Sequence, residues 1–380
     1  MKELKEPKEQ KVTRILISAG GTGGGVYPAL AVAEVLRQQP DVVLHFVSSA
    51  TGLENDLLTK AGIRLDEWDK VQAGPLHRVN PIKLIRSIFR LFIGIGQSLA
   101  LLRRKKPAVV FLTGGWVGIP VAIAAWLYRI PMVIFVPDIE PGRTLKLLGR
   151  FAKVITATSR DTARYYGKNK QVVETGYPLR SSLLTVTREQ SIQALGLDST
   201  KKTLLVFGGS QGSRAINRAV MSGLPELLKN TELQIFHVSG KLDAAAVQSA
   251  HDELPDELQS RYHVRDYVHE FGYALAAADL AISRAGASTL GEDTFFGLPA
   301  ILVPLANTWR YQKVNADWLA ERGAAIHLEE ERMAEELVPL VNALFNDPAR
   351  LNLMKEAARK LAYTDGAANI AKEILNLAAF

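Results

Sequence analysis

Short uncharged runs rich in branched apolar residues alternate along the chain with longer stretches in which apolar residues recur at helical spacing. The short runs are typical of parallel strands buried on both faces, and the longer stretches are typical of the helices that cover them. Strands are predicted at 14–19, 42–48, 108–112, 132–135 and 153–157, then at 203–207, 234–238, 280–283 and 300–303. Helices are predicted at 28–38, 53–61, 120–127, 213–228 and 288–296. The pattern predicts an α/β protein of two doubly wound, Rossmann-like domains, with ligands at the carboxyl ends of the strands.

The two series of strands meet in a polar segment that begins near residue 176. A chain of 380 residues is long enough for two domains, each with its own core. Residues 1–11 alternate Lys and Glu without an apolar core, which predicts a disordered tail rather than a secretory signal. The sequence has no cysteine, which excludes disulfides, thiolate metal sites and cysteine nucleophiles and agrees with a reducing cytoplasm.

Positive charge is concentrated in one part of a chain whose net charge is +7. Residues 71–137 contain nine Lys or Arg and no Asp or Glu. Within 82–106, cations alternate with aliphatic and aromatic residues, which indicates either a core-facing helix with a charged edge or a helix on an anionic membrane surface. Nucleic acid is a weaker alternative, because the cations interleave mainly with aliphatic residues and with only one aromatic pair, Phe89 and Phe92, rather than with a series of stacking platforms. The cations are Lys83, Arg86, Arg90 and Arg103, Arg104, Lys105 and Lys106.

The segment 107–128 has 22 residues without a charge, which is long enough for a membrane-spanning helix. It is interrupted by Gly114, Gly115, Gly118 and Pro120, residues that break helices. We therefore expect a buried strand, a turn and a second, helical part rather than a membrane span.

Two glycine-rich turns, 20–25 and 208–212, each follow a predicted strand and each open an amphipathic stretch. Backbone N–H groups at such a turn, together with the positive end of a helix dipole, form an anion site. The dinucleotide fingerprint fails, because Val26 replaces its third glycine and the second strand ends in Ser48 and Ser49 rather than an acid. Neither turn continues into a P-loop, and the lack of any Asp-x-Asp weakens a metal-bridged nucleotide-sugar site. One phosphorylated ligand held between two similar domains is the expectation.

A rival interpretation comes from Gly208-x-Ser210-x-Gly212, which has the spacing of the nucleophile elbow of α/β-hydrolases. It would make Ser210 a nucleophile, with Asp279 and His327 as partners. It leaves the first glycine turn without a role.

The order of motifs along the chain resembles the MurG family of UDP-N-acetylglucosamine transferases, which act on lipid-linked N-acetylmuramyl-pentapeptide. The similarity covers about 15–325. It rests on Gly20-Gly21-Thr22-Gly23-Gly24-x-Val26-x-Pro28, Gly114-Gly115-Trp116-Val117, Gly176-Tyr177-Pro178-Leu179-Arg180, Gly208-Gly209-Ser210-Gln211-Gly212-Ser213-Arg214, Ser239-Gly240-Lys241, Arg284-Ala285-Gly286-Ala287-Ser288-Thr289-x-x-Glu292, Gly297-Leu298-Pro299-Ala300 and Gln312-x-x-Asn315-Ala316.

The resemblance implies a GT-B fold, with two domains facing a cleft. It implies inverting transfer without a metal or other cofactor, and attachment to the cytoplasmic, inner face of the cell membrane. We expect an acceptor and membrane domain at 12–180, joined by the C-terminal helix 362–380, and a UDP-sugar domain at 181–361. The implied partners are UDP-N-acetylglucosamine, a lipid-linked acceptor and an anionic membrane surface, and no nucleic acid.

Carried over position by position, the resemblance places the nucleotide sugar in the second domain. Ser210, Gln211 and Gly212 match the cradle of the β-phosphate, and Arg180 matches a charge partner of the diphosphate. Val268 matches a backbone contact to uracil, and Glu292 the acceptor of ribose hydroxyl groups. The remaining matched positions are Ala287, Ser288 and Thr289 at a second phosphate loop, Gln312 and Asn315 at the sugar, and Thr22, Gly23 and Gly24 in the first domain.

The sequence departs from the family on the acceptor side. A family histidine proposed to help deprotonate the acceptor is Gly25 here, and the family's His-Glu-Gln-Asn is Phe135-Val136-Pro137-Asp138. Tyr311 replaces a second glutamine. Either Asp138, with Glu140 behind it, replaces the lost base, or the chain uses another lipid acceptor, or it binds a UDP-sugar without turnover.

Overall fold

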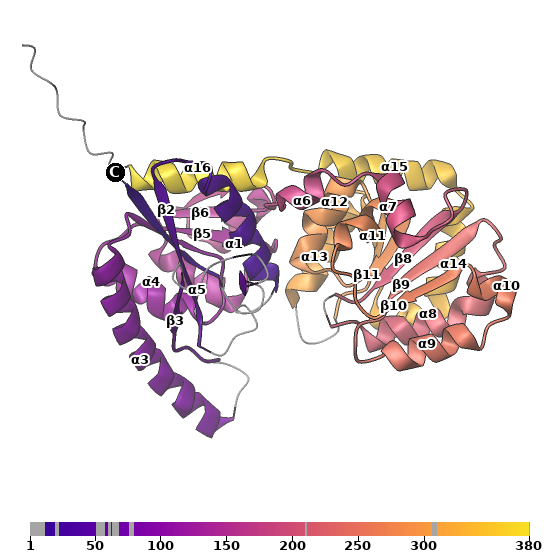
Figure 1. Cartoon of the computed structure of the whole chain (residues 1–380), viewed down its shortest axis with the longest axis horizontal. Coiled ribbons are helices and arrows are strands. Elements are labelled where there is room, and N and C mark those ends of the chain that lie inside the picture. The colour runs from indigo at the N-terminus through magenta and orange to yellow at the C-terminus, as the bar shows by residue number, and fades with distance from the viewer. Residues whose placement is uncertain are drawn as a thin grey trace, which may run out of the picture. The chain divides into compact units, whose positions relative to one another are not determined.

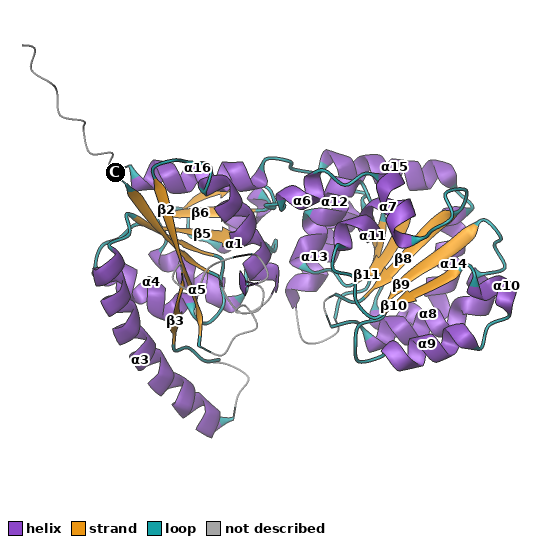
Figure 2. Cartoon of the chain, in the orientation of Figure 1, coloured by secondary structure: helices purple, strands orange, loops and turns teal. Residues whose placement is uncertain are grey.

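The computed structural model describes residues 12–19, 23–50, 58–59, 62, 68–75, 80–209, 211–305 and 310–379. Its contacts divide the chain into two α/β units, each built on one parallel sheet (Figures 1 and 2). The first unit comprises Met1–Val136, Arg143–Thr175 and Ala367–Phe380, and the second comprises Pro137–Gly142 and Gly176–Gly366. The chain thus enters the second unit twice, at 137–142 and at 176–366, before its last helix returns to the first one.

The first sheet has seven strands in the order β3-β2-β1-β4-β5-β6-β7, and all of its pairs are parallel. Its strand order reverses between β1 and β4, where the fold leaves a crevice for ligands at the carboxyl ends. The strands are β1 (Thr13–Ser18), β2 (Val42–Ser49), β3 (Trp68–Val71), β4 (Val109–Leu112), β5 (Met132–Val136), β6 (Val154–Ala157) and β7 (Gln171–Glu174).

Helices cover both faces of this sheet: α1 (Gly23–Leu36), α3 (Pro81–Lys105), α4 (Gly118–Leu127), α5 (Arg143–Phe151) and α16 (Gly366–Ala378), with a short 3-10 helix η2 (Arg160–Tyr165). In Figure 1 the yellow α16 lies among the indigo and magenta elements of the first unit, where Asn369 Nδ2 donates to Thr175 O at 3.2 Å. The expected helix at 53–61 falls mostly outside the described residues. The uncharged segment 107–128 divides into β4 and α4, as predicted.

The second sheet has six parallel strands in the order β10-β9-β8-β11-β12-β13. They are β8 (Lys202–Phe207), β9 (Leu233–Val238), β10 (Tyr262–Arg265), β11 (Leu280–Ser283), β12 (Ala300–Leu302) and β13 (Ala325–His327). One apolar cluster packs α8 (Arg214–Leu227) and α14 (Met333–Phe345) on one face, and another packs α11 (Phe271–Ala277) and α13 (Arg310–Glu321) on the other. The remaining elements are α6 (Ser181–Leu184), α7 (Arg188–Leu195), α9 (Ala244–Asp252), α10 (Asp256–Gln259), η3 (Ala287–Leu290), α12 (Glu292–Phe296), η4 (Glu330–Arg332) and α15 (Pro348–Lys360).

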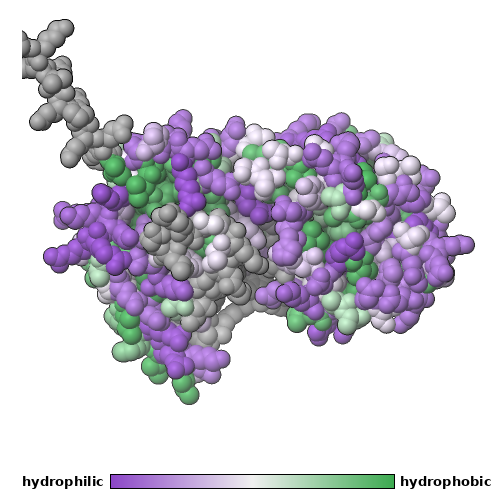
Figure 3. Space-filling view, viewed as in Figure 1, coloured by the Kyte–Doolittle hydropathy of each residue, from purple (hydrophilic) through white to green (hydrophobic). Residues whose placement is uncertain are grey.

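Helix α3 leaves most of its apolar surface uncovered. Asn80 caps its first turn, with its side chain accepting the N–H of Lys83 at 2.8 Å, and Pro81 provides a helical φ at the first position. Ile85 is 68% exposed and Phe89 is 67% exposed. Among the described residues this is the one helix long and apolar enough to cross a membrane, although only 22% of its most apolar window is buried. In Figure 3 hydrophobic and hydrophilic residues lie side by side along it.

Candidate active site

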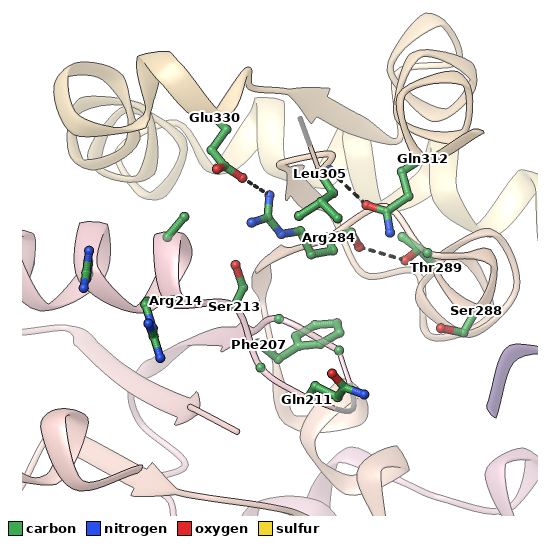
Figure 4. Close-up of a pocket in the computed structure, with 16 residues that line it drawn as sticks. Phe207, Gln211, Ser213, Arg214, Arg284, Ser288, Thr289, Leu305, Gln312 and Glu330 are labelled. Carbon is green, nitrogen blue, oxygen red and sulfur yellow. Dashed lines mark hydrogen bonds and ion pairs between the residues drawn. The ribbon is translucent and has the colours of Figure 1, made fainter. Parts of the chain in front are cut away.

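A cavity of about 670 Å³ opens at the carboxyl ends of β8 and β11 in the second unit, the edge at which a doubly wound sheet binds ligands. Its walls come from two loops, the glycine turn after β8 and the loop after β11, together with α13 and η4 (Figure 4). The lining carries the side chains of Arg214, Arg218 and Arg284 against one carboxylate, that of Glu330. A site with this excess of arginine suits a phosphorylated ligand.

The glycine turn needs glycine for steric reasons. A Cβ on Gly208 would lie 2.1 Å from Ser213 N, and one on Gly212 would lie 2.1 Å from Ser239 O. Gly212 also has a φ of +80°. Ser213 then caps α8, with its Oγ accepting the N–H of Ile216 at 3.4 Å, so the positive end of a 14-residue helix faces the cavity. Ser210 lies outside the described residues, while Gln211 and Gly212 line the cavity.

Arg284 forms the opposite wall. Its guanidinium Nη1 lies 2.5 Å from Glu330 Oε2 and donates to the carbonyl oxygens of Val303 and Pro304 at 3.1 and 3.2 Å (Figure 4). The hydroxyl of Thr289 donates to Arg284 O at 3.3 Å. These contacts fix a nearly buried cation at the carboxyl end of β11. Ser288 and Thr289 were predicted from the sequence as site residues, whereas Arg284, Glu330, Arg214 and Arg218 were not. The position of Arg284 directly after a buried strand is the sequence feature that could have indicated it.

Gln312 lies in the first turn of α13 and lines the same cavity. Its Oε1 accepts the N–H of Leu305 at 3.0 Å, so its Nε2 is the side of the amide that can donate to a ligand (Figure 4). This geometry suits the predicted contact of Gln312 with a sugar hydroxyl.

Asn315 does not suit the same role. Its side chain is fully buried, and its Nδ2 donates to Asp138 Oδ1 at 2.8 Å and to Ala285 O at 3.2 Å. Its Oδ1 accepts the N–H of Ile139 at 3.1 Å. Both amide hydrogens are therefore used inside the protein, and none remains for a sugar. Through Asp138 and Ile139, Asn315 instead holds the loop 137–142 on the second unit.

The two carboxyl groups of this loop have different surroundings. Burial raises the pKa of Asp138 to about 6, and the hydrogen bond from Asn315 only partly opposes the shift. Glu140 instead lies 3.1 Å from Arg310 Nε, with only 13% of its side chain exposed. Both residues belong by their contacts to the second unit, whereas the sequence placed 137–142 inside the first domain.

Glu292 is the first residue of α12 and is partly buried. Burial raises its pKa to about 7, and the charge of Arg180 opposes this shift. The charges of Arg180 and Glu292 therefore influence each other, and neither residue is among those that line the cavity. Ala287 begins η3, and Val268 packs against the apolar cluster around α11.

The first glycine turn is described only in part. Gly20, Gly21 and Thr22 lie outside the described residues, and Gly23 and Gly24 are the first two residues of α1. The helix starts earlier than predicted and contains Pro28. Gly25, in its first turn, carries no ionisable group.

The hydrolase arrangement is wrong for the proposed partners. Asp279 immediately precedes β11, where its Oδ2 accepts from Arg188 Nη2 and from Thr203 N, both at 2.9 Å. It thus lies at the amino end of a sheet whose carboxyl end carries the glycine turn. His327 instead contacts Asp317 Oδ1 through Nδ1 at 2.6 Å. The acid and the histidine have separate structural partners.

Comparison with known proteins gives a consistent result. The glycosyltransferase family 28 N-terminal domain matches residues 15–157, and the family 28 C-terminal domain matches residues 203–374. The curated UDP-N-acetylglucosamine–N-acetylmuramyl-(pentapeptide) pyrophosphoryl-undecaprenol N-acetylglucosamine transferase of Desulforudis audaxviator is 36% identical over 361 residues, covering 92% of this chain and 94% of that protein. The enzyme of the same name from Listeria monocytogenes is 34% identical over 367 residues, covering 96% and 99%.

Solved structures agree with the sequence relatives. The crystal structure of Acinetobacter baumannii MurG superposes with a TM-score of 0.75 at 29% identity, covering 96% of this chain and 99% of that one. The UDP-GlcNAc 2-epimerase of Neisseria meningitidis, at 16% identity and a TM-score of 0.69, shares the fold. Two parallel-sheet domains of the GT-B type are thereby confirmed, and the chain belongs to the MurG family within glycosyltransferase family 28.

Proposed function

We propose that this chain transfers N-acetylglucosamine from UDP-N-acetylglucosamine to a lipid-linked muramyl-pentapeptide during peptidoglycan precursor synthesis. The activity named for its relatives supports this function, and one observation on the chain itself carries it. A glycine turn, the amino end of α8 and three arginines converge on one cavity in the second unit. That combination binds a diphosphate through backbone N–H groups and guanidinium groups.

The donor roles follow from chemistry at the matched positions. The turn at Ser210, Gln211 and Gly212 holds the β-phosphate, with Arg180 as a further cation. Glu292 accepts the ribose hydroxyl groups, and Gln312 donates to the sugar. The matched uracil contact is the backbone of Val268, and Ala287, Ser288 and Thr289 form the second phosphate loop.

The reaction is a single displacement that inverts the anomeric carbon. An acceptor hydroxyl oxygen forms the new bond to that carbon while the bond to the β-phosphate oxygen breaks, and UDP leaves with the electron pair. The hydroxyl proton passes to a base. Asp138 is the candidate, because a carboxyl whose pKa is raised to about 6 accepts a proton more readily than an ordinary aspartate. Arginines stabilise the charge that develops on the diphosphate, so the mechanism needs no metal.

We further propose that α3 holds the protein on the cytoplasmic face of the membrane. Its exposed Ile85, Phe89 and Phe92 alternate with Lys83, Arg86 and Arg90 along one helix. Apolar side chains of this kind enter the boundary of the acyl chains, and each nearby cation adds roughly 1 kcal/mol of attraction to anionic lipid.

A UDP-release assay with lipid-linked muramyl-pentapeptide tests the function. We expect release that requires both that acceptor and UDP-N-acetylglucosamine, and much less with UDP-glucose. Release only with a different lipid acceptor supports the second candidate, which the changed acceptor-side positions Gly25 and Asp138 favour. UDP binding without release from any acceptor would indicate a non-catalytic homologue.

A further inference from the structure

A chain of hydrogen bonds lies behind the glycine turn and connects β10 and β9 with α8. Tyr262 Oη lies 2.7 Å from His237 Nδ1, and His237 Nε2 lies 2.9 Å from Asn217 Oδ1. The side chains of Tyr262, His237 and Asn217 are fully buried. Asn217 Nδ2 donates to Ser239 O at 2.9 Å and to Asp243 Oδ2 at 3.0 Å.

The donor and acceptor roles in this hydrogen-bond network follow from the partners of Asn217. Asn217 uses Nδ2 as the donor to two oxygen acceptors, so its Oδ1 faces His237 and must accept the Nε2 proton. His237 Nδ1 is then an acceptor, and Tyr262 donates to it. Burial lowers the pKa of His237 to about 3 and raises that of Tyr262, so both stay neutral across the working pH. Ser239 O and Asp243 therefore fix the orientation of the Asn217 amide, and Asn217 Oδ1 fixes the tautomer of His237. Tyr262 then satisfies Nδ1 of His237.

The first arm from Asn217 leads to the glycine turn. Ser239 and Gly240 form the backing on which Gln211 and Gly212 rest. A Cβ on Gly212 would lie 2.1 Å from Ser239 O, and a Cβ on Gly240 would lie 2.5 Å from Gln211 O. Because the two loops touch through bare backbone, a small shift of Ser239 O moves the turn that lines the cavity.

The second arm leads to a cation of the cavity. Asp243 accepts from Asn217 through Oδ2 and from Arg214 Nε through Oδ1, at 3.0 and 3.2 Å. The side chain of Arg214 is 63% exposed and lines the cavity. Asn217 thus contacts the backbone that supports the glycine turn and, through Asp243, the guanidinium of Arg214.

We propose that Asn217, whose Oδ1 accepts from the buried His237, is a positioning residue for the diphosphate of the sugar nucleotide. It holds Ser239 and Gly240 against the glycine turn and, through Asp243, keeps Arg214 at the cavity. The proposal rests on the proposed donor site in the second unit. If the amide turned over, its oxygen would face Ser239 O and Asp243 Oδ2, which are both acceptors, so the network admits one arrangement.

The test compares Asn217→Asp with Gln234→Leu in the full-length chain. Gln234 lies on β9 with His237 and is also buried. It donates to Asp198 O at 2.8 Å and Thr203 Oγ1 at 3.0 Å, at the opposite end of β9. Asn217→Asp retains the acceptor for His237 but cannot donate to Ser239 O and repels Asp243. We expect the Kd for UDP, measured by calorimetry, to rise about 10- to 100-fold in Asn217→Asp and to stay within about twofold in Gln234→Leu, although both lower the Tm.

Two milder variants decide the matter if Asn217→Asp does not fold. Asp243→Asn releases Arg214 and is expected to raise the Kd for UDP about fivefold. Tyr262→Phe, which leaves Nδ1 of His237 without its donor, is expected to raise it about threefold. The donor KM should rise in parallel while kcat at saturating donor stays within about threefold. Wild-type Kd and KM in folded variants overturn the proposal. Failure of the wild-type protein itself to bind UDP would instead overturn the proposed donor site.

Discussion

Two interior strands, β1 and β8, are each followed in the sequence by a glycine-rich segment and then by a helix, but the described residues around the two segments differ. The turn at 208–212 leads into α8 and lies in a cavity with three arginines, and a buried hydrogen-bond network supports it from behind. The turn at 20–25 leads into α1, and Gly25 stands where the family has a histidine. A diphosphate demands fixed N–H groups and cations, which the second unit provides at the proposed donor site. A proton needs only one suitably placed acceptor, and a carboxylate elsewhere can supply it.

Asp138 provides the strongest test of this difference between the two glycine-rich segments. Asp138→Asn removes the proposed base while its Oδ1 can still accept from Asn315, so we expect kcat to fall about 10²-fold or more and the Kd for UDP to stay unchanged. Since the pKa of Asp138 is raised to about 6, the carboxylate form is lost as the pH falls through 6, and kcat of the wild-type enzyme should fall about tenfold per unit below it. A wild-type kcat in Asp138→Asn contradicts the assignment. Asp198→Asn, at a half-exposed carboxyl that accepts from Thr200, provides a control with the same loss of charge.

A second prediction concerns the membrane role that we assign to the first domain. Replacing both Arg86 and Arg90 with Gln should reduce sedimentation with phosphatidylglycerol vesicles about 30-fold in partition coefficient, because each cation contributes roughly 1 kcal/mol. Raising the salt concentration should have the same effect on the wild-type protein. Replacing Lys201 and Lys229 of the second domain with Gln provides a matched loss of charge. Equal binding to neutral and anionic vesicles would contradict the surface helix.

A third prediction sharpens the donor side. The pKa of Glu292 is raised to about 7, so in the free protein this carboxyl becomes protonated as the pH falls below 7. If the carboxylate accepts the ribose hydroxyl groups, the Kd for UDP-N-acetylglucosamine should rise, by up to about tenfold, between pH 7.5 and pH 6. Glu292→Gln should bind more weakly at pH 7.5 and lose this pH dependence. Calorimetry at both pH values gives the answer, and an unchanged slope in the variant would remove Glu292 from the site.

The smallest effect is expected at Gly25. Restoring the family residue with Gly25→His should change kcat by less than about threefold, because Phe135-Val136-Pro137-Asp138 lacks the amide and the acid that accompany the histidine in the family. An increase of tenfold or more would mean that the first glycine turn still provides the base position, and that Asp138 is not needed.

The strands that the hydrophobic pattern did not predict all lie at the edges of the two sheets. Every interior strand was predicted, whereas β3, β7, β10 and β13, the outer strands of the two sheets, were not. Their sequences, such as Trp68–Val71 with Asp69 and Lys70, and Gln171–Glu174, are short and polar. An edge strand pairs on one side only and meets water on the other, so it needs no continuous apolar run. Its pairing depends on a neighbour that is distant in the sequence.

The functional residues divide in the same way. The sequence alone predicted the glycine-rich segments and the basic segment of α3, because strand–turn–helix signals and charge runs lie within a few neighbouring residues. Its lack of cysteine also excluded cysteine chemistry. The tertiary structure alone decided that 137–142 packs on the second unit, that Asn315 holds Asp138, and that Arg284 pairs with Glu330. These contacts join segments tens of residues or more apart, and each depends on which side chains meet when the sheets assemble. The periodicity of apolar residues along the sequence carries no information about such contacts.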